Sequence, residues 1–197
     1  MIVPDDVLDF WFAGDATRYR AVWFKQDAAF DADCARFADA LHAARGGASD
    51  HWTGSARGML ALIVLLDQFS RNLHRGSPDS FAADAQARAL ARDAVARGFD
   101  RVLHPTERSF IYLPFEHSED PADQDESVRL FETLRLALGD STVEYAYRHR
   151  DVIRRFRRFP HRNAVLGRES TPEERRYLAE PGTGFMLPLP RLRERVG

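Results

Sequence analysis

Residues 59–74 read Met-Leu-Ala-Leu-Ile-Val-Leu-Leu-Asp-Gln-Phe-Ser-Arg-Asn-Leu-His, and this stretch predicts a central buried helix. When this segment is wound as an α-helix, at about 100° per residue, apolar side chains surround its first turns and a polar stripe then begins on one side. Asp67 and Arg71 are four residues apart and can pair along the helix, with Gln68 and Asn72 on the neighbouring row. The pattern fits a pocket wall with a polar mouth or a central helix that emerges into solvent.

The same helical spacing of apolar residues recurs along the chain, and two-residue alternation is almost absent. The expected fold is therefore all-α, with stacked antiparallel helices. Helix starts are indicated at Thr53, Ser77 and Thr142, and most strongly at Thr171, whose hydroxyl precedes a proline and two acids. The predicted helices span residues 4–12, 17–25, 28–45, 54–74, 79–97, 106–113, 122–138, 142–158 and 172–179.

The composition excludes several classes of protein. The 197 residues hold 28 basic and 30 acidic side chains, so a polycation that coats nucleic acid is excluded. Hydrophobic residues make up 44% and include 14 Phe, which is enough for a packed core. The sole cysteine, Cys34, lies in an apolar helical stripe and is expected to be a buried hydrophobe.

We expect one domain over residues 1–185 and a proline-containing tail over residues 186–197. The longest apolar run covers residues 59–66, well short of the roughly 20 residues that span a membrane. The acidic amino terminus shows no secretory signal, and a single cysteine forms no internal disulfide. We therefore expect a soluble, cytoplasmic protein.

A second polar segment lies between two prolines, at residues 114 and 121. Its five polar residues are predicted to form a helix end or a tight loop. His117 has carboxylates on both sides, which favour its positive form and suit acid/base chemistry with Glu116, Glu119 or Asp120, or metal ligation. The alternative is a capped turn before a helix that begins near Ala122.

A third segment, residues 148–168, contains eight arginines and one acid, a local charge of +7. His149 falls on the apolar face of a predicted helix, which is typical of a buried core histidine. Pro160 has to end or kink this helix, which leaves His161, Arg162 and Asn163 in the following turn. The arginines fit either a solvated face paired with the protein's own acids or a site for phosphate or carboxylate groups.

Several common catalytic motifs are missing from the sequence. It has no Gly-x-x-x-x-Gly-Lys loop and no Gly-x-Gly-x-x-Gly turn, which speaks against the usual nucleotide-binding enzymes. It has no His-Glu-x-x-His or Glu-x-x-His pair and no Gly-x-Ser-x-Gly elbow. We therefore predict no cofactor and assign no metal ligands.

Taken together, these segments resemble a bacterial family called domain of unknown function 924, from about residue 5 to Phe185. The resemblance implies an all-helical, tetratricopeptide-like fold with a superhelical repeat, and it implies no established reaction. In the motif over residues 155–163 the family pattern has glycine where this chain has Arg157. If that glycine permits close approach of a ligand, the Arg157 side chain would crowd it. The motifs are Val7-Leu-Asp-Phe-Trp-Phe12, Trp23-Phe24, Leu65-Leu-Asp-Gln-Phe-Ser-Arg-Asn72, Arg75-Gly76, Tyr112-Leu-Pro-Phe-Glu-His-Ser-Glu-Asp120, Gln124, Arg155-Phe-Arg-Arg-Phe-Pro-His-Arg-Asn163, Leu166-Gly-Arg168 and Ser170-Thr-Pro-Glu-Glu174.

Three functions follow as hypotheses. The first is a binding module that holds a small anionic ligand or a peptide carboxylate on a concave surface. The second is a hydrolase or lyase, with or without a metal, that uses His117, Glu116 and Asp120. The third is a structural or oligomerisation protein whose polar motifs are internal braces. No nucleic-acid or membrane partner is expected, and the oligomeric state is open. The candidate ligand-binding residues are Asp67, Gln68, Arg71, Asn72, His117, His149, His161, Arg162 and Asn163.

Overall fold

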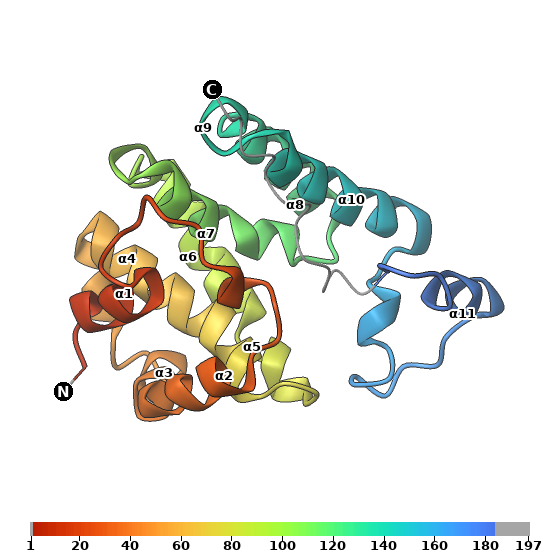
Figure 1. The fold of residues 1–197 in the computed structure, drawn as a ribbon, viewed down its shortest axis with the longest axis horizontal. Helices are drawn as coiled ribbons and strands as arrows, with labels where there is room; N and C mark the ends of the chain where they lie inside the picture. Colours follow the sequence, from red (N-terminus) through yellow and green to blue (C-terminus); the bar gives the residue numbers. More distant parts are fainter. Residues whose placement is uncertain (1, 184–197) are drawn as a thin grey trace, which may run out of the picture.

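Helices account for all regular secondary structure in residues 2–183, the part of the chain that this computed structural model describes (Figure 1). The α-helices are α1 (Pro4–Phe12), α2 (Ala28–Cys34), α3 (Ala38–Arg45), α4 (Ala56–Ile63), α5 (Ser70–Leu73), α6 (Asp84–Ala96), α7 (Pro105–Glu116), α8 (Pro121–Glu132), α9 (Arg135–Leu138), α10 (Asp140–Phe156) and α11 (Pro172–Leu178). Six short 3₁₀ turns and one π-helical segment connect them: η1 (Ala21–Trp23), η2 (Ala35–Phe37), η3 (Asp50–Gly54), η4 (Val64–Phe69, the π-helical one), η5 (Pro78–Phe81), η6 (Asp100–Val102) and η7 (Pro160–Arg162).

The longer helices stack in the order in which they occur in the chain. α1 packs on α4, α4 on α6, α6 on α7, α7 on α8, and α8 on α10, while α11 lies beyond the end of α10 (Figure 1). The predicted all-helical stack is confirmed. The tetratricopeptide-like arrangement stays a prediction, as does a single domain over residues 1–185, and the predicted tail lies outside the described residues.

The core of the stack is rich in aromatic side chains. Trp11 of α1 is fully buried, and its ring packs against Phe69 at 5.2 Å and Phe110 at 5.7 Å between ring centres. Every residue from 58 to 70 is buried, as the apolar pattern of the central segment predicts. Cys34 is also buried, and burial raises the pKa of its thiol to about 12, which fits a packing role.

The predicted helix over residues 17–25 is wrong, because only Ala21–Trp23 forms a 3₁₀ turn. This segment instead closes the carboxyl end of α1. Nη1 of Arg20 donates to the carbonyl oxygens of Phe10 and Trp11, and Nε1 of Trp23 also donates to Trp11 O at 2.9 Å. Free carbonyls at a helix end need such partners, and satisfying them holds the segment in an irregular path.

Helix starts are confirmed where the capping chemistry is complete. Thr171 forms a capping box with Glu174, as predicted. Ser77 caps only the 3₁₀ turn η5, and the α-helix predicted from residue 79 begins at Asp84. Thr53 is not a cap, because Ser55 directly precedes α4 and its Oγ accepts from the amide of Gly58 in the first turn. Thr142 is not a cap either, since α10 already starts at Asp140.

The central segment and α7 also depart from prediction. The helix expected over residues 54–74 divides into α4, η4 and α5, and α7 runs through Pro114 to Glu116 rather than ending at residue 113. Among residues 2–183, no helix combines the length and the apolar content that crossing a membrane requires.

Candidate functional site

The polar part of the central segment begins at Asp67, which lies in η4 and is almost completely buried. π-helical segments inside helices frequently occur at functional sites. Oδ1 of Asp67 lies 2.8 Å from Nδ1 of His117 and 3.0 Å from Nη1 of Arg71, and Oδ2 accepts a hydrogen bond from Gln68. Burial opposes the charge of this carboxylate, but Arg71 and His117 hold its pKa below the ordinary value.

His117 directly follows α7, and Asp67 fixes the tautomer of its ring. An ionised carboxylate only accepts hydrogen bonds, so Nδ1 of His117 has to donate. Burial and then the positive charge of Arg71 lower the pKa of His117, so the ring is neutral at pH 7. The expectation that nearby carboxylates favour the positive form is therefore wrong, because burial outweighs them.

Arg71 links Asp67 to Asp84, the first residue of α6. Its guanidinium makes two hydrogen bonds to the Asp84 carboxylate, at 2.9 and 3.1 Å, and donates to Asp67 O at 2.6 Å. The predicted pair of Asp67 and Arg71 is present. Asp84 was not predicted, since it lies inside the helix predicted over residues 79–97 and the sequence gives no signal that marks it.

Arg162 reaches the same carboxylate from η7, far along the chain. Its Nη2 donates to His117 O at 3.0 Å, and its Nη1 lies 3.5 Å from Oδ2 of Asp84. The guanidinium is sandwiched between two rings, 4.6 Å from the centres of both Phe81 and Phe159. The residue is 7% exposed, and burial followed by repulsion from Arg71 lowers its pKa to about 10.

Glu116 and His149 form a buried layer between α7 and α10. Nδ1 of His149 lies 2.8 Å from Tyr145 O and 3.4 Å from Oε1 of Glu116. Burial, assisted by Asp67, raises the pKa of Glu116 to about 8, and burial holds the pKa of His149 well below its ordinary value. At pH 7, Glu116 is therefore protonated and His149 is neutral.

His161 and Arg162 lie in the turn after α10, as predicted for the third segment. Burial and then Arg162 lower the pKa of His161 to about 3, and its ring lies 5.5 Å from that of Phe159. Asn163 has a different task, because its amide donates to Oγ of Ser170 at 3.0 Å. It therefore ties down the loop that follows η7.

Two predicted residues are engaged elsewhere. The amide of Asn72 donates to Oδ1 of Asp31 in α2 at 2.6 Å, so this side chain braces α5 against α2. Asp120 is exposed and caps α8, since its Oδ1 accepts from the amide of Ala122 at 2.8 Å. The capped-turn interpretation thus describes Asp120, whereas His117 and Glu116 lie in the buried network.

Glu119, in the second polar segment, binds residues of the third segment (148–168). Its Oε1 accepts from the amide of Phe159 at 2.8 Å, and Arg168 makes two hydrogen bonds to the carboxylate, at 2.7 and 3.0 Å. Nη2 of Arg168 also donates to Phe159 O at 3.1 Å. These contacts fix the ring of Phe159 beside the guanidinium of Arg162.

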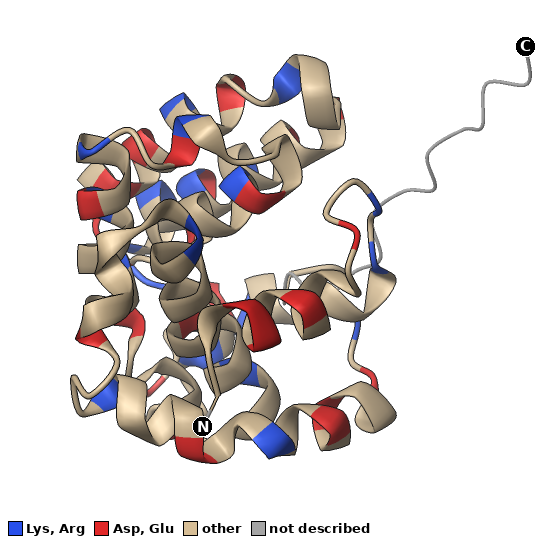
Figure 2. Ribbon diagram, turned by 90° about the vertical axis from the view of Figure 1, so that its left-hand side faces the viewer, with Lys and Arg blue, Asp and Glu red and all other residues tan. Residues whose placement is uncertain are grey.

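Most of the arginine-rich segment pairs with the protein's own acids, and blue and red positions are intermingled over the helices in Figure 2. Arg154 lies 2.9 Å from Asp125, and Arg155 lies 2.8 Å from Glu173. Arg158 binds Glu174 with two hydrogen bonds. The solvated-face interpretation therefore fits these arginines, and Arg162 is the one that joins Asp67, Arg71 and His117.

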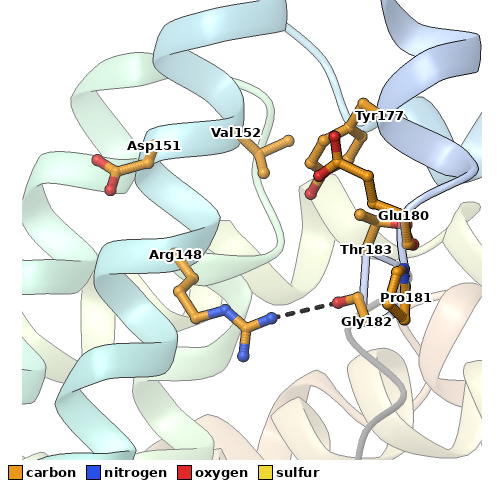
Figure 3. A pocket seen from close by; sticks show the side chains of 8 residues that line it. All are labelled: Arg148, Asp151, Val152, Tyr177, Glu180, Pro181, Gly182 and Thr183. Atoms are coloured by element: carbon orange, nitrogen blue, oxygen red, sulfur yellow. Dashed lines mark hydrogen bonds between the residues drawn. The ribbon is translucent and has the colours of Figure 1, made fainter.

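A shallow hollow of about 290 Å³ lies between α10 and the segment after α11 (Figure 3). Nη2 of Arg148 donates to Gly182 O at 3.2 Å across it. None of the predicted site residues lines this hollow, whose walls are Arg148, Asp151, Val152, Tyr177, Glu180, Pro181, Gly182 and Thr183. Within residues 2–183, no group of three or more His, Cys, Asp and Glu side chains has the arrangement of a metal site.

The comparisons with known proteins agree with this architecture. A solved structure of a protein of unknown function from Agrobacterium tumefaciens is 44% identical to the chain, with a TM-score of 0.80. The match covers 89% of this chain and 96% of that one. No curated protein matches the chain. The model of the family described as bacterial protein of unknown function (DUF924) matches residues 7–182, and the chain belongs to this family.

Proposed function

We propose that the protein binds a small anionic ligand, or the carboxylate of a peptide, at the cluster of Asp67, Arg71, Asp84, His117 and Arg162, called here the Arg162 site. The observation that carries the proposal is that the buried guanidinium of Arg162 has more hydrogen-bond donors than acceptors around it. A guanidinium has five N–H donors, and in residues 2–183 only Nη1 and Nη2 of Arg162 have acceptors, the first at 3.5 Å. Within the described residues, its buried Nε has none.

The charges around Arg162 support an anion as the missing partner. Arg71 stands next to it and shares Asp84 with it, so two guanidinium groups depend on the same carboxylate. An oxyanion would supply acceptors to both, and arginine's planar fork matches the geometry of carboxylate and phosphate. The side chains of Arg71, Asp84 and His117 are 20%, 15% and 16% exposed, which leaves a route from solvent.

The test is titration of the purified protein with inorganic phosphate and with succinate, followed by calorimetry and by thermal unfolding. An anion that binds the folded protein raises the melting temperature, and the rise grows with the logarithm of the anion concentration once this exceeds Kd. We expect Arg162→Ala and Arg71→Ala to abolish the heat and the shift. Arg154→Ala is the matched control, because Arg154 pairs with Asp125 at an exposed position of the same region. Unchanged ligand-induced shifts in both site variants would refute the proposal.

An acid/base enzyme is the second candidate, and the pair of Asp67 and His117 favours it. A carboxylate on Nδ1 that leaves Nε2 as a base is the arrangement of many hydrolases. Turnover of an activated phosphate or carboxyl ester that His117→Gln abolishes and Asp120→Asn retains would support this function. If the purified protein turns over neither ester, that counts against it.

We further infer cytoplasmic residence from the single buried cysteine, and a tetratricopeptide-like superhelix from the sequential stacking of α4, α6, α7, α8 and α10. The structural alternative, in which the polar motifs are only braces, predicts that no anion changes the melting temperature. The titrations above therefore also separate a brace from a site.

A further inference from the structure

The Arg162 site offers hydrogen-bond donors and acceptors in unequal numbers, and this inequality says what kind of anion fits. Arg71 and Arg162 carry donors only. The carboxylates of Asp67 and Asp84 could accept, but arginine and histidine donors already occupy them. Among the described residues, the acceptor at this site that carries neither a hydrogen bond nor a negative charge is Nε2 of His117.

The hydrogen bond to Asp67 decides what His117 offers. Its Nδ1 donates to Oδ1 of Asp67 at 2.8 Å, so in the neutral ring Nε2 is an acceptor. Within residues 2–183, no group hydrogen-bonds Nε2, and 16% of the side chain is exposed. The same Oδ1 lies 3.0 Å from Nη1 of Arg71, so the imidazole and this guanidinium are direct neighbours. Burial and the adjacent Arg71 lower the pKa of His117, which keeps the ring in this form at pH 7.

We propose that the ligand of the Arg162 site is an oxyanion that carries its own hydroxyl group, such as hydrogen phosphate or a 2-hydroxycarboxylate. The anionic oxygens accept from Arg71 and Arg162, while the hydroxyl donates to Nε2 of His117. An oxyanion without a proton would place a negatively charged oxygen against the lone pair of Nε2, which costs binding free energy. This inference rests on the proposed function and narrows its ligand class.

The experiment compares matched anions by calorimetry at pH 7. Phosphate retains a proton at this pH and sulfate does not, although both are tetrahedral. Lactate and propionate differ only by the hydroxyl. We expect phosphate to bind at least about tenfold more tightly than sulfate, and lactate more tightly than propionate, because a site built around a hydroxyl rejects an analogue that lacks it.

The variant His117→Phe removes the acceptor, so the ratio of the two affinities within each pair of anions should fall to about one. If circular dichroism shows that this variant is unfolded, His117→Gln replaces it, since its amide presents either a donor or an acceptor and should weaken the preference. Arg154→Ala, the exposed control, should retain the wild-type ratios.

The outcomes separate this inference from the proposed function. If all four anions bind through Arg162 with equal affinity, or if His117→Phe keeps the wild-type ratios, the inference is overturned and anion binding stands. If neither the four anions nor succinate bind the wild-type protein, the proposed function fails, and the inference fails with it. If lactate binds more tightly than propionate but phosphate binds no more tightly than sulfate, the site is assigned to hydroxycarboxylates.

Discussion

The carboxylate of Asp67 meets the imidazole of His117 at 2.8 Å, although fifty residues of sequence separate them. The contact joins η4 to the end of α7, and Arg71 and Arg162 extend it to α6 and η7. η4, α6 and α7 pack against one another, and Arg162 joins η7 to them, so the polar network also stabilises their packing. A role in stability and a role in binding therefore have to be measured separately.

Asp67→Ala is expected to lower the free energy of unfolding by about 3 kcal/mol, because it leaves Arg71 and His117 without their buried carboxylate. Urea denaturation measures this loss. The control is Asp125→Ala, which removes an exposed partner of Arg154 and should cost less than about 1 kcal/mol. Equal losses in the two variants would mean that the Asp67 network contributes little to the fold.

Glu116→Gln is expected to stabilise the protein at pH 8 and to have little effect at pH 5. In the folded chain the pKa of Glu116 is raised from 4.5 to about 8, so this carboxyl keeps its proton while the unfolded chain loses it. Between these two values the unfolded state binds fewer protons, and the free energy of unfolding falls as pH rises.

Glutamine mimics the protonated carboxyl and removes this loss, with a gain at pH 8 on the order of 4 kcal/mol. The difference between the variant and the wild type, measured by denaturation from pH 5 to 8, isolates the contribution of Glu116 from those of the other groups in the protein. A difference that stays constant over this range would contradict the assignment of a protonated Glu116.

The sequence supported the helical stack well, because apolar spacing and capping chemistry are local. Thr171 with Glu174 carries both halves of a capping box, and the helix begins where they predict. Residues 17–25 have the apolar spacing of a helix, yet the free carbonyls at the end of α1 bind Arg20 and Trp23 and hold this segment open. That competition depends on a neighbouring element and leaves no mark within the segment.

The site was predictable by residue type but not by arrangement. Asp67 and Arg71 stood out as a polar stripe on an apolar helix, and His117 and Arg162 as members of a polar and an arginine-rich segment. Asp84 lies inside the helix predicted over residues 79–97, where nothing in the sequence marks it. The protonation of His117 also escaped prediction, because its sequence neighbours are acids while its spatial environment is buried and next to Arg71. Electrostatics of this kind depend on distances that sequence spacing does not give.

Gly58→Ala is expected to destabilise the protein by about 2 kcal/mol through overpacking. Gly58 lies in the first turn of α4, where an added Cβ would stand 2.1 Å from the carbonyl oxygen of Trp52. The clashing atoms of Trp52 belong to the backbone, which prevents an easy adjustment. Gly54→Ala is the matched control, since nothing lies within 4 Å of a Cβ at that position. A thermal or urea midpoint that falls equally in both variants would show that the contact between η3 and α4 is not tight.

Arg157→Gly is expected to raise the free energy of unfolding by about 1 kcal/mol, because Arg157 adopts the left-handed conformation that glycine adopts without strain. Its φ is 61°, and its amide closes α10 by donating to Ile153 O at 2.8 Å. The residue is exposed, so the glycine of the family pattern is explained by this backbone angle and not by close approach of a ligand.

Urea denaturation of Arg157→Gly measures the gain in the free energy of unfolding. Arg154→Gly is the control, and its free energy of unfolding should fall. Arg154 is also exposed but lies inside α10 with ordinary helical geometry, where glycine costs about 1 kcal/mol. Phosphate binding should be unchanged in Arg157→Gly, since Arg157 belongs to the helix end and not to the Arg162 site. If this variant is less stable than the wild type, the Arg157 side chain makes contacts that outweigh the strain of its backbone.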